Sequence, residues 1–451
     1  MKKISLKLLA LFVIFTFVIM ACAPEPVETP PPDEPPPPEP EYDVPAEYME
    51  FEGETVSVIA VWGGEELDSF RAMVEPWEEW TGATMDFEGT RDLGAVLTTR
   101  IEGGNPPDIA GIPGPGQLEE WATEDHMVDL STFLDMNELR DMYDESWLDL
   151  ATHNDGLYGL FTKVAVKSLV WYNVPEFEAA GYEIPETWDE MIALSDQIVE
   201  DGVTPWCIGI ESGAATGWPF TDWVEDIMLR TAGPDLYMDW AFYNIPWTHE
   251  SIQNAWELAG EIMTNEEYVD GGVTGVLATN FGESVFPIYE DPPGCYLHRQ
   301  ATFIQGFILD QFPELEPFED YDYFLFPEID PEYGKPILSA GDLFGMFNDT
   351  PAARSLIEWL AGAESQEIWA ARGGFISPNR DVDVEVYPDP VIREAARLLV
   401  EADIVRFDAS DMMPGAVNEA FWSGAIEYLE NPENLEQILQ NIDDVAAESY
   451  D

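Results

Sequence analysis

Short apolar runs alternate with helical patterns along most of the chain. Residues 55–61 (TVSVIAV) form a β-branched run, and a glycine pair at 63–64 separates it from apolar positions at helical spacing that end at Gly82. The unit then repeats as a strand, a helix and a strand, at residues 83–87, 91–102 and 108–112. This alternation predicts a doubly wound α/β sheet, with its ligand side at the carboxyl ends of the strands.

A second α/β unit is predicted further along the chain. Residues 158–173 (YGLFTKVAVKSLVWYN) alternate like paired extended strands and indicate a crossover between two halves. Thr187 and Glu190 form a capping box, which predicts a helix through Val199. The other predicted elements are a helix at 117–134, a strand at 205–210, a helix at 218–231 and a helix that begins at residues 349–351.

The first residues have the pattern of a secretory leader. Three early lysines precede the apolar run at 8–20, which is shorter than the roughly 20 residues of a membrane span. Residues 19–22 (IMAC) resemble a bacterial lipobox, which implies a signal peptide at 1–21 and a lipid on Cys22. An ordinary signal peptide followed by an incidental cysteine is the alternative.

A tether is expected after Cys22. Residues 23–47 contain eleven prolines and eight acids, a composition that supplies no core and predicts an extended, self-repelling segment. We assign residues 22–53 to this lipidated tether. It would hold a folded domain near a membrane and leave it free to move.

Composition narrows the class of protein. The chain has 451 residues, with 90 acids against 18 Lys plus Arg and a formal charge of −72, so binding to nucleic acid phosphates is excluded. Its 16 Trp, 17 Tyr and 24 Phe are enough for a large core and argue against disorder throughout. The acidity fits a saline habitat, where salt screens the repulsion, or simply an acid-tolerant secreted surface.

Two cysteines remain if Cys22 carries a lipid. Cys207 and Cys295 can pair in an oxidising environment outside the cell, and two buried free thiols are the alternative.

Known catalytic and metal motifs are missing from the sequence. It contains no GxSxG, HExxH, Walker or CxxC pattern, and its four histidines have no ligand spacing. Glycines 111, 114 and 116 come in the wrong order for a dinucleotide fingerprint and indicate a turn. We therefore expect no cofactor, no metal and no catalysis.

Aromatic residues stand beside polar ones at several predicted junctions. Examples are Trp62 before Glu65 and Glu66, Trp218 after Glu211, and Trp422 after Phe421. Sugars present apolar C–H faces and hydroxyl rims, so a sugar cleft needs flat aromatic surfaces with polar groups at the edge. Packing in the core is the competing interpretation for each tryptophan.

The scarce cations are a further signal. Lys163 and Lys167 lie on one face of the predicted crossover strand, and Arg372 ends a helix just before two glycines. They either contact a ligand or neutralise neighbouring acids, and the sequence leaves both readings open.

Several long stretches resemble the extracellular solute-binding proteins of ABC importers. Within that group the chain is most similar to the sugar-binding family and its alpha-glucoside members, from about Glu54 to about Leu429. The stretches that carry the resemblance are LVWYN (169–173), PETWDEMIALSDQI (185–198), GWPFTDW (217–223), SAGDLFGMFNDTP (339–351), ESQEIWAARGGFISPN (364–379) and MPGAVNEAFW (413–422).

This resemblance implies a type II periplasmic-binding fold, in which two doubly wound α/β lobes joined by crossover strands hold a ligand between them. The crossovers would fall near Lys163, Lys335 and Phe375. The N-lobe would combine residues 54–163 with 336–375, and the C-lobe would combine 164–335 with 376–451.

The resemblance also implies a set of ligand-binding residues. In this sequence they are Trp62, Glu65, Glu66, Lys167, Tyr172, Glu211, Trp218 and Trp422. We add Asp342 and Arg372 to the predicted ligand-binding set. The chain departs from the family at the loop 111–114, where a ligand contact is either lost or made by backbone. It also departs at 295–300, where His298 and Arg299 would take over polar contacts.

The expected function is therefore that of a substrate-binding lipoprotein of an ABC importer, outside the cytoplasm. It would act as a monomer, bind a sugar such as an alpha-glucoside by hinge closure, and deliver it to membrane permease subunits. A secreted glycoside-processing enzyme and a structural surface lipoprotein are the alternatives.

Overall fold

A computed structural model describes residues 51–450 of the chain. The predicted signal peptide, the lipid site Cys22 and most of the tether lie outside this range. Within it, no helix is both long and apolar enough to cross a membrane.

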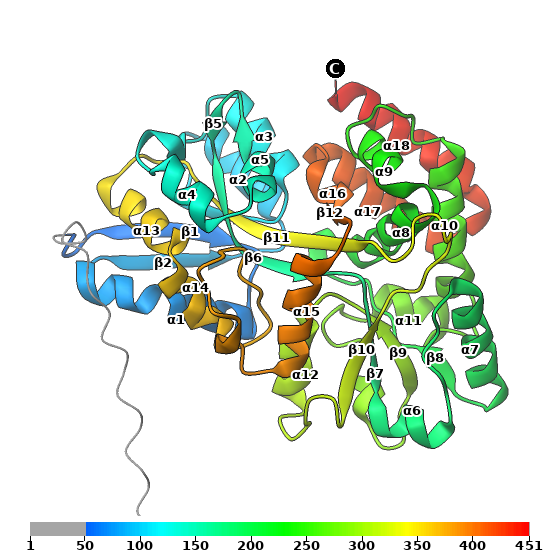
Figure 1. Cartoon of the computed structure of the whole chain (residues 1–451). Helices are drawn as coiled ribbons and strands as arrows, with labels where there is room; N and C mark the ends of the chain where they lie inside the picture. The colour runs from blue at the N-terminus through cyan, green and yellow to red at the C-terminus, as the bar shows by residue number, and fades with distance from the viewer. Residues whose placement is uncertain (1–50, 451) are drawn as a thin grey trace, which may run out of the picture. The chain divides into compact units, whose positions relative to one another are not determined.

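The N-lobe is built on a six-stranded mixed sheet (Figure 1). Its strands are β1 (Thr55–Ala60), β2 (Thr84–Gly89), β3 (Ile109–Ile112), β6 (Gly159–Val166), β11 (Ile337–Met346) and β12 (Val405–Phe407). The order is β12-β11-β3-β1-β2, with β6 paired to β11. The first three strands are parallel, as predicted, and β11 runs antiparallel to β3. This places the carboxyl ends of β1 and β3 at one edge of the sheet.

Helices flank this sheet. They are α1 (Gly64–Thr81), α2 (Leu93–Glu102), α3 (Pro115–Thr123), α4 (Met136–Met142), α5 (Glu145–Leu150), α13 (Pro351–Ala361), α14 (Ala363–Ala370) and α15 (Pro390–Glu401), with a small hairpin of β4 (Thr152–His153) and β5 (Gly156–Leu157). Helix α1 stops where Gly82 adopts a left-handed conformation, which glycine tolerates best. Thr350 caps α13. The first position of a helix tolerates proline, because the N–H that proline lacks would have no partner within the helix.

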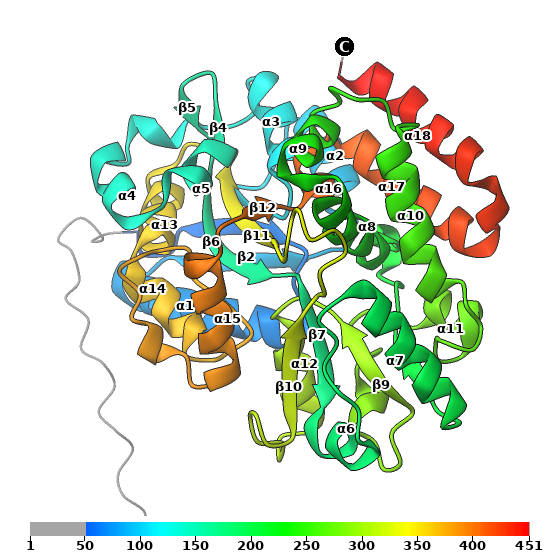
Figure 2. The same cartoon turned by 45° about the vertical axis from the view of Figure 1, so that its right-hand side comes forward.

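The C-lobe has a four-stranded sheet in the order β10-β7-β9-β8 (Figure 2). The strands are β7 (Leu169–Asn173), β8 (Thr204–Trp206), β9 (Cys295–Arg299) and β10 (Tyr321–Leu325). The helices are α6 (Val174–Ala180), α7 (Trp188–Glu200), α8 (Trp218–Thr231), α9 (Gly233–Ala241), α10 (Glu250–Met263), α11 (Gly272–Ala278), α12 (Ile304–Gln311), α16 (Ala409–Met412), α17 (Gly415–Glu430) and α18 (Leu435–Ser449). The predicted capping box of Thr187 and Glu190 is present at the start of α7.

A disulfide joins Cys207 and Cys295, whose Cα atoms lie 5.6 Å apart. It ties the end of β8 to the start of β9, so the predicted pairing is present.

The segment predicted as paired strands is divided between the two sheets. β6 pairs with β11, whereas β7 pairs with β9 and β10, and residues 167–168 carry the chain across. The crossover near Lys163 thus falls within β6. The predicted third crossover near Phe375 does not fit the sheet, because β12 pairs with β11 and keeps the chain on the N-lobe sheet as far as Phe407.

Two other predictions were wrong in their extent. The helix expected at 117–134 ends at Thr123, and Asp125 then turns the chain with a positive φ of 59°. The strand expected at 205–210 ends at Trp206. The amide of Cys207 still donates to Leu297 of β9, but the amide of Ile210 donates to Val276 of α11 and not to a strand.

Candidate functional site

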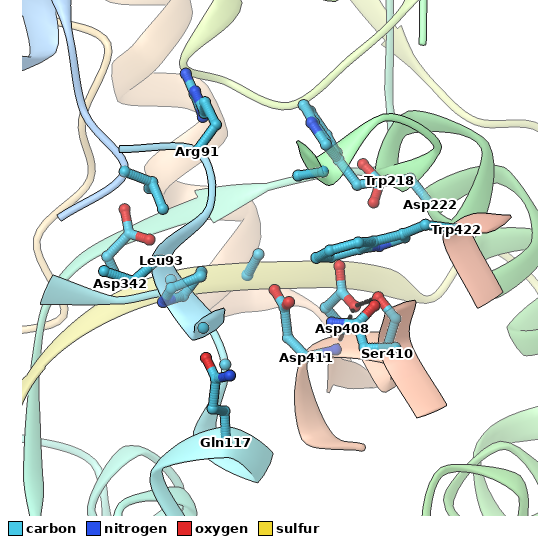
Figure 3. A pocket seen from close by; sticks show the side chains of 18 of the residues that line it. Arg91, Leu93, Gln117, Trp218, Asp222, Asp342, Asp408, Ser410, Asp411 and Trp422 are labelled. Carbon is cyan, nitrogen blue, oxygen red and sulfur yellow. Dashed lines mark hydrogen bonds between the residues drawn. The ribbon is translucent and has the colours of Figure 1, made fainter. Parts of the chain in front are cut away.

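A cavity of about 220 Å³ lies between the two lobes (Figure 3). The N-lobe wall comes from loops at the carboxyl ends of β1, β2 and β3 and from the crossing strands β6 and β11. The C-lobe wall comes from the starts of α8 and α17 and from α16. Labelled side chains of the N-lobe (Arg91, Leu93, Gln117, Asp342) face those of the C-lobe side (Trp218, Asp222, Asp408, Ser410, Asp411, Trp422) in Figure 3. This is the edge where a doubly wound sheet places its ligand.

Two half-buried tryptophans form the apolar part of the C-lobe wall. Trp218 opens α8, and its ring lies edge-on to Phe281 at a centroid distance of 5.1 Å. Trp422 lies on α17, and its indole Nε1 is buried without a hydrogen-bond partner among the described residues. A side chain at Gly217 would lie 2.6 Å from the carbonyl oxygen of Trp422, so glycine there lets the two helices bring both indoles to one wall.

Trp62 belongs to the core more than to the cavity wall. It lines the cavity but is only 2% exposed, because Phe70, Phe344 and Trp369 pack edge-on against its ring. Its Nε1 donates to Asp342 at 2.9 Å. The expectation that Trp62 offers a ring face to a ligand is therefore corrected: it positions Asp342.

Lys163 is held between two acids on the N-lobe side. Its ammonium pairs with Glu66 and lies 3.2 Å from Asp342. Burial acts to lower the pKa of Lys163, but the two carboxylates outweigh it and the pKa is raised. Lys163 therefore stays charged, and its carboxylate neighbours are held at fixed positions beside the cavity.

Lys167 is the centre of a second, more deeply buried network. Its ammonium contacts Asp222 at 2.7 Å, pairs with Asp408, and lies 5.4 Å from the ring centre of Trp218. Burial lowers the pKa of Lys167, but the two acids more than compensate and raise it well above its usual value. Because Lys167 follows β6 and Asp408 follows β12, the pair links two segments that join the lobes.

Asp222 and Asp408 also lie close to a third buried acid, Glu225. Oxygens of Asp222, Glu225 and Asp408 lie within 4.8 Å of one another. Sequence analysis did not identify this group. The ammonium of Lys167 already contacts two of its members, so it supplies the positive charge that a metal would bring, and we propose no metal site here.

Glu225 gives the network a pH dependence. Burial, aided by the charges of Asp408 and Asp222, raises the pKa of Glu225 well above its usual value. A glutamate with a raised pKa keeps its proton in the folded chain, whereas the same side chain in the unfolded chain ionises above about pH 4.3. The contribution of Glu225 to stability therefore falls as pH rises. Glu225→Gln keeps the acceptor for the Ser410 amide, 3.1 Å away, and cannot titrate.

We expect the free energy of unfolding to fall less steeply between about pH 5 and about pH 7 in Glu225→Gln than in the unmodified chain. Urea denaturation at several pH values measures both slopes. Equal slopes would show that Glu225 is ionised in the folded protein.

Arg91 was missed by the sequence analysis. It lies in the loop after β2 and lines the cavity, and its guanidinium lies 5.0 Å from the ring centre of Phe281, on the C-lobe. No ion pair of Arg91 occurs among residues 51–450. A guanidinium over an aromatic ring contributes about 0.5–2 kcal/mol, so this contact favours the closed arrangement of the lobes.

We expect Arg91→Ala and Phe281→Leu each to weaken ligand binding by about three- to tenfold, and the double variant to lose little more. Calorimetric titration of the three variants measures this coupling. Arg100→Ala is the control, since Arg100 pairs with Glu88 on the surface. Additive losses would mean that Arg91 and Phe281 act separately.

Six residues of the predicted set do not line the cavity. They are Glu65, Tyr172, Glu211, His298, Arg299 and Arg372. Glu65 is exposed on the first turn of α1, and the Nε of Arg372 donates to Ser69 of the same helix at 2.9 Å. Tyr172 is 7% exposed and packs against Phe177 and Phe324 within the C-lobe.

The other three are engaged elsewhere in the C-lobe. Glu211 accepts hydrogen bonds from Asn280 and the amide of Gly213, which lower its pKa. His298 bonds through Nδ1 to the Cys207 carbonyl, and burial lowers its pKa to about 4, so it is neutral. Arg299 is buried within the C-lobe, where it pairs with Asp222 and Asp226.

The loop after β3 forms part of the cavity wall. Pro113 and Gly114 line the cavity, and a side chain at Gly116 would lie 2.2 Å from the carbonyl oxygen of Met413. Glycine is therefore required for α3 to approach the C-lobe this closely.

Two α/β lobes on crossing strands, with a polar and aromatic cavity between them, define a binding protein of the type II periplasmic-binding fold. The chain belongs to the family of bacterial extracellular solute-binding proteins, whose sequence pattern matches residues 63–367. That family is one of binding proteins that act outside the cytoplasm.

Curated relatives extend over most of the chain. The osmoprotective compounds-binding protein GgtB of Synechocystis is 44% identical over 86% of this chain and 91% of its own length. The alpha-glucosides-binding periplasmic protein AglE of Rhizobium meliloti is 39% identical over 84% of each chain.

Solved structures share the fold at low sequence identity. A chitin oligosaccharide binding protein has a TM-score of 0.75 at 21% identity and covers 88% of this chain and 98% of its own. Maltose-bound MalE3 of T. maritima has a TM-score of 0.67 at 16% identity and covers 88% of this chain and 99% of its own.

Proposed function

We propose that this chain is the substrate-binding component of an ABC importer and binds a sugar, such as an alpha-glucoside oligosaccharide, between its lobes. The observation that carries the proposal is the cavity wall in which Trp218 and Trp422 stand beside Asp222, Asp408 and Asp411. Indoles match the apolar faces of a sugar ring, and carboxylates accept bonds from its hydroxyl rim. The name of the relative AglE, an alpha-glucosides-binding protein, supports this ligand class.

Closure of the lobes would control delivery. The lobes are joined through β6, β11 and the segment after β12, and the cavity is made from both of them. A ligand that contacts both walls binds the closed arrangement better and so shifts the equilibrium towards it. The closed monomer would then present a composite surface to the membrane permease.

The ligand would leave unchanged. Four of the acids that line the cavity, Glu66, Asp342, Asp222 and Asp408, are paired with Lys163 and Lys167, an arrangement suited to holding hydroxyl groups. The lipid on Cys22 and the tether would keep the chain at the outer face of a membrane. Replacement of Cys22 by Ser should release the protein from the membrane fraction.

A melting-temperature screen against neutral mono-, di- and oligosaccharides tests the proposal. We expect at least one α-linked glucoside to raise the melting temperature and to be recovered intact by chromatography after incubation. No shift with any sugar would contradict the sugar-binding function, and cleavage products would favour a glycoside-processing enzyme.

A further inference from the structure

Three acids that line the cavity, Asp92, Asp411 and Glu419, have no side-chain hydrogen bond or ion pair among the described residues, and of these only Asp411 is not exposed. It lies on α16, half-buried, and points into the cavity near Trp422 and Ser410 in Figure 3. The backbone amide of Asp411 donates to Asp408 at 3.1 Å. Within residues 51–450, however, no hydrogen bond or ion pair involves its side-chain oxygens. An unpaired carboxyl in this position is available to a ligand.

A neighbouring group is also unpaired. Asn418 lines the same cavity and is 9% exposed, and its Oδ1 has no hydrogen-bond partner in the described part of the chain. Both Asn418 Oδ1 and a carboxylate accept hydrogen bonds, whereas the unpaired Nε1 of Trp422 donates one. A complementary ligand therefore brings several donors to this wall and at least one acceptor.

The charges around the cavity are also unequal. Seven acids line it against three cations: Glu66, Asp92, Asp222, Asp342, Asp408, Asp411 and Glu419 against Arg91, Lys163 and Lys167. Each lysine is already shared by two carboxylates, and Arg91 is placed over Phe281. An anionic ligand would therefore meet a surplus of negative charge, whereas a cationic one would meet an unoccupied carboxyl.

We propose that the cavity selects sugars by charge, accepting neutral and amino-substituted sugars and rejecting sugar acids, with Asp411 as the residue that discriminates. The inference rests on the proposed sugar-binding function and adds the chemical class of the ligand.

The hydrogen-bonding chemistry of a hydroxyl, an ammonium and a carboxylate group on the sugar explains why neutral and amino sugars would be accepted and sugar acids rejected. A hydroxyl both donates and accepts, so a neutral sugar satisfies Asp411, Asn418 and Trp422 together. An ammonium donates and forms a charge-assisted bond with a carboxylate, which is about twice as strong as a neutral one. A sugar carboxylate only accepts hydrogen bonds, and it would face the carboxylate of Asp411 and the Oδ1 of Asn418, which are also acceptors. Burial, reinforced by Asp408, raises the pKa of Asp411. An ammonium opposite Asp411 would lower that pKa and favour the carboxylate, whereas a sugar carboxylate would raise it further.

The test uses two matched series of probes. Trehalose and maltose are each compared with the analogue in which one primary hydroxyl is replaced by an amine and with the corresponding uronic acid. Calorimetric titration of the full chain gives the dissociation constants. We expect the uronic acid to bind at least about tenfold more weakly than the parent sugar, and the amine to bind as tightly as the parent or tighter.

The variant Asp411→Asn tests the assigned residue. It should reduce the ratio of the uronic acid and amine dissociation constants by about fivefold or more, because it removes the ionisable group and keeps the shape. Asp403→Asn is the control, since Asp403 is exposed and lies outside the cavity.

Each outcome has a distinct meaning. Equal affinity for a sugar and its uronic acid overturns the charge selection while sugar binding stands. An unchanged ratio in Asp411→Asn overturns the role of Asp411. Failure of every neutral sugar, in these series and in the wider melting screen, overturns the proposed function and the inference with it.

Discussion

Replacing either Trp218 or Trp422 by Ala should weaken sugar binding by about 30-fold or more, because each indole supplies a flat apolar face for a sugar ring. Removing an aromatic anchor from the centre of a binding site costs about 2–4 kcal/mol, and each 1.4 kcal/mol is a factor of ten in affinity. Both side chains are half-buried, so the fold should survive the change. Calorimetric titration measures the affinity, and the melting temperature reports the fold.

Two controls separate stacking from general damage. Trp422→Phe keeps an aromatic face and should lose much less affinity than Trp422→Ala. Phe242→Ala removes an aromatic side chain that is 46% exposed and outside the cavity, and should leave binding unchanged. Unchanged affinity in both alanine variants would remove the two tryptophans from the site.

Lys167→Met should lower the free energy of unfolding by about 3–5 kcal/mol. Asp222 and Asp408 are each about 1% exposed at the side chain and share the Lys167 ammonium. Removing one partner of a buried ion pair leaves uncompensated charge in a medium where it is poorly solvated. Urea denaturation of both proteins measures the loss.

An exposed lysine provides the matched comparison. Lys335 pairs with Glu186, whose side chain is 74% exposed, and Lys335→Met should cost less than about 1 kcal/mol. If the two variants lose the same stability, Lys167 is not the electrostatic centre of this region. Loss of sugar binding without loss of stability would instead place Lys167 in direct contact with the ligand.

Local patterns predicted the elements well where one short signal decides them. The Thr187 and Glu190 capping box, the glycine stop at Gly82 and the helix at residues 218–231 all appear in the structure. These features depend on hydrogen bonds between near neighbours. The helix at 117–134 failed because a positive φ at Asp125 interrupts an apolar pattern that continues past it.

The candidate site was harder to predict, because its residues come from distant segments. Asp408 and Asp411 stand among 90 acids in the sequence, and only the pairing of β12 with β11 brings them beside Lys167 and Asp222. One signal from the sequence was the pair of lysines near the crossing strand, which line the cavity. The three predicted tryptophans differ in burial, which the sequence could not show. Trp62 is buried and donates to Asp342, whereas Trp218 and Trp422 remain available to a ligand.

A crystal structure of the protein with the sugar that gives the largest rise in melting temperature tests the central claim most directly. We expect the sugar ring between the lobes, with its carbon atoms about 4 Å from the indole of Trp218 or Trp422 and its hydroxyls bonded to the carboxylates on the same wall. A sugar bound outside this cavity, or inside it without contact to either indole, would contradict the proposed site.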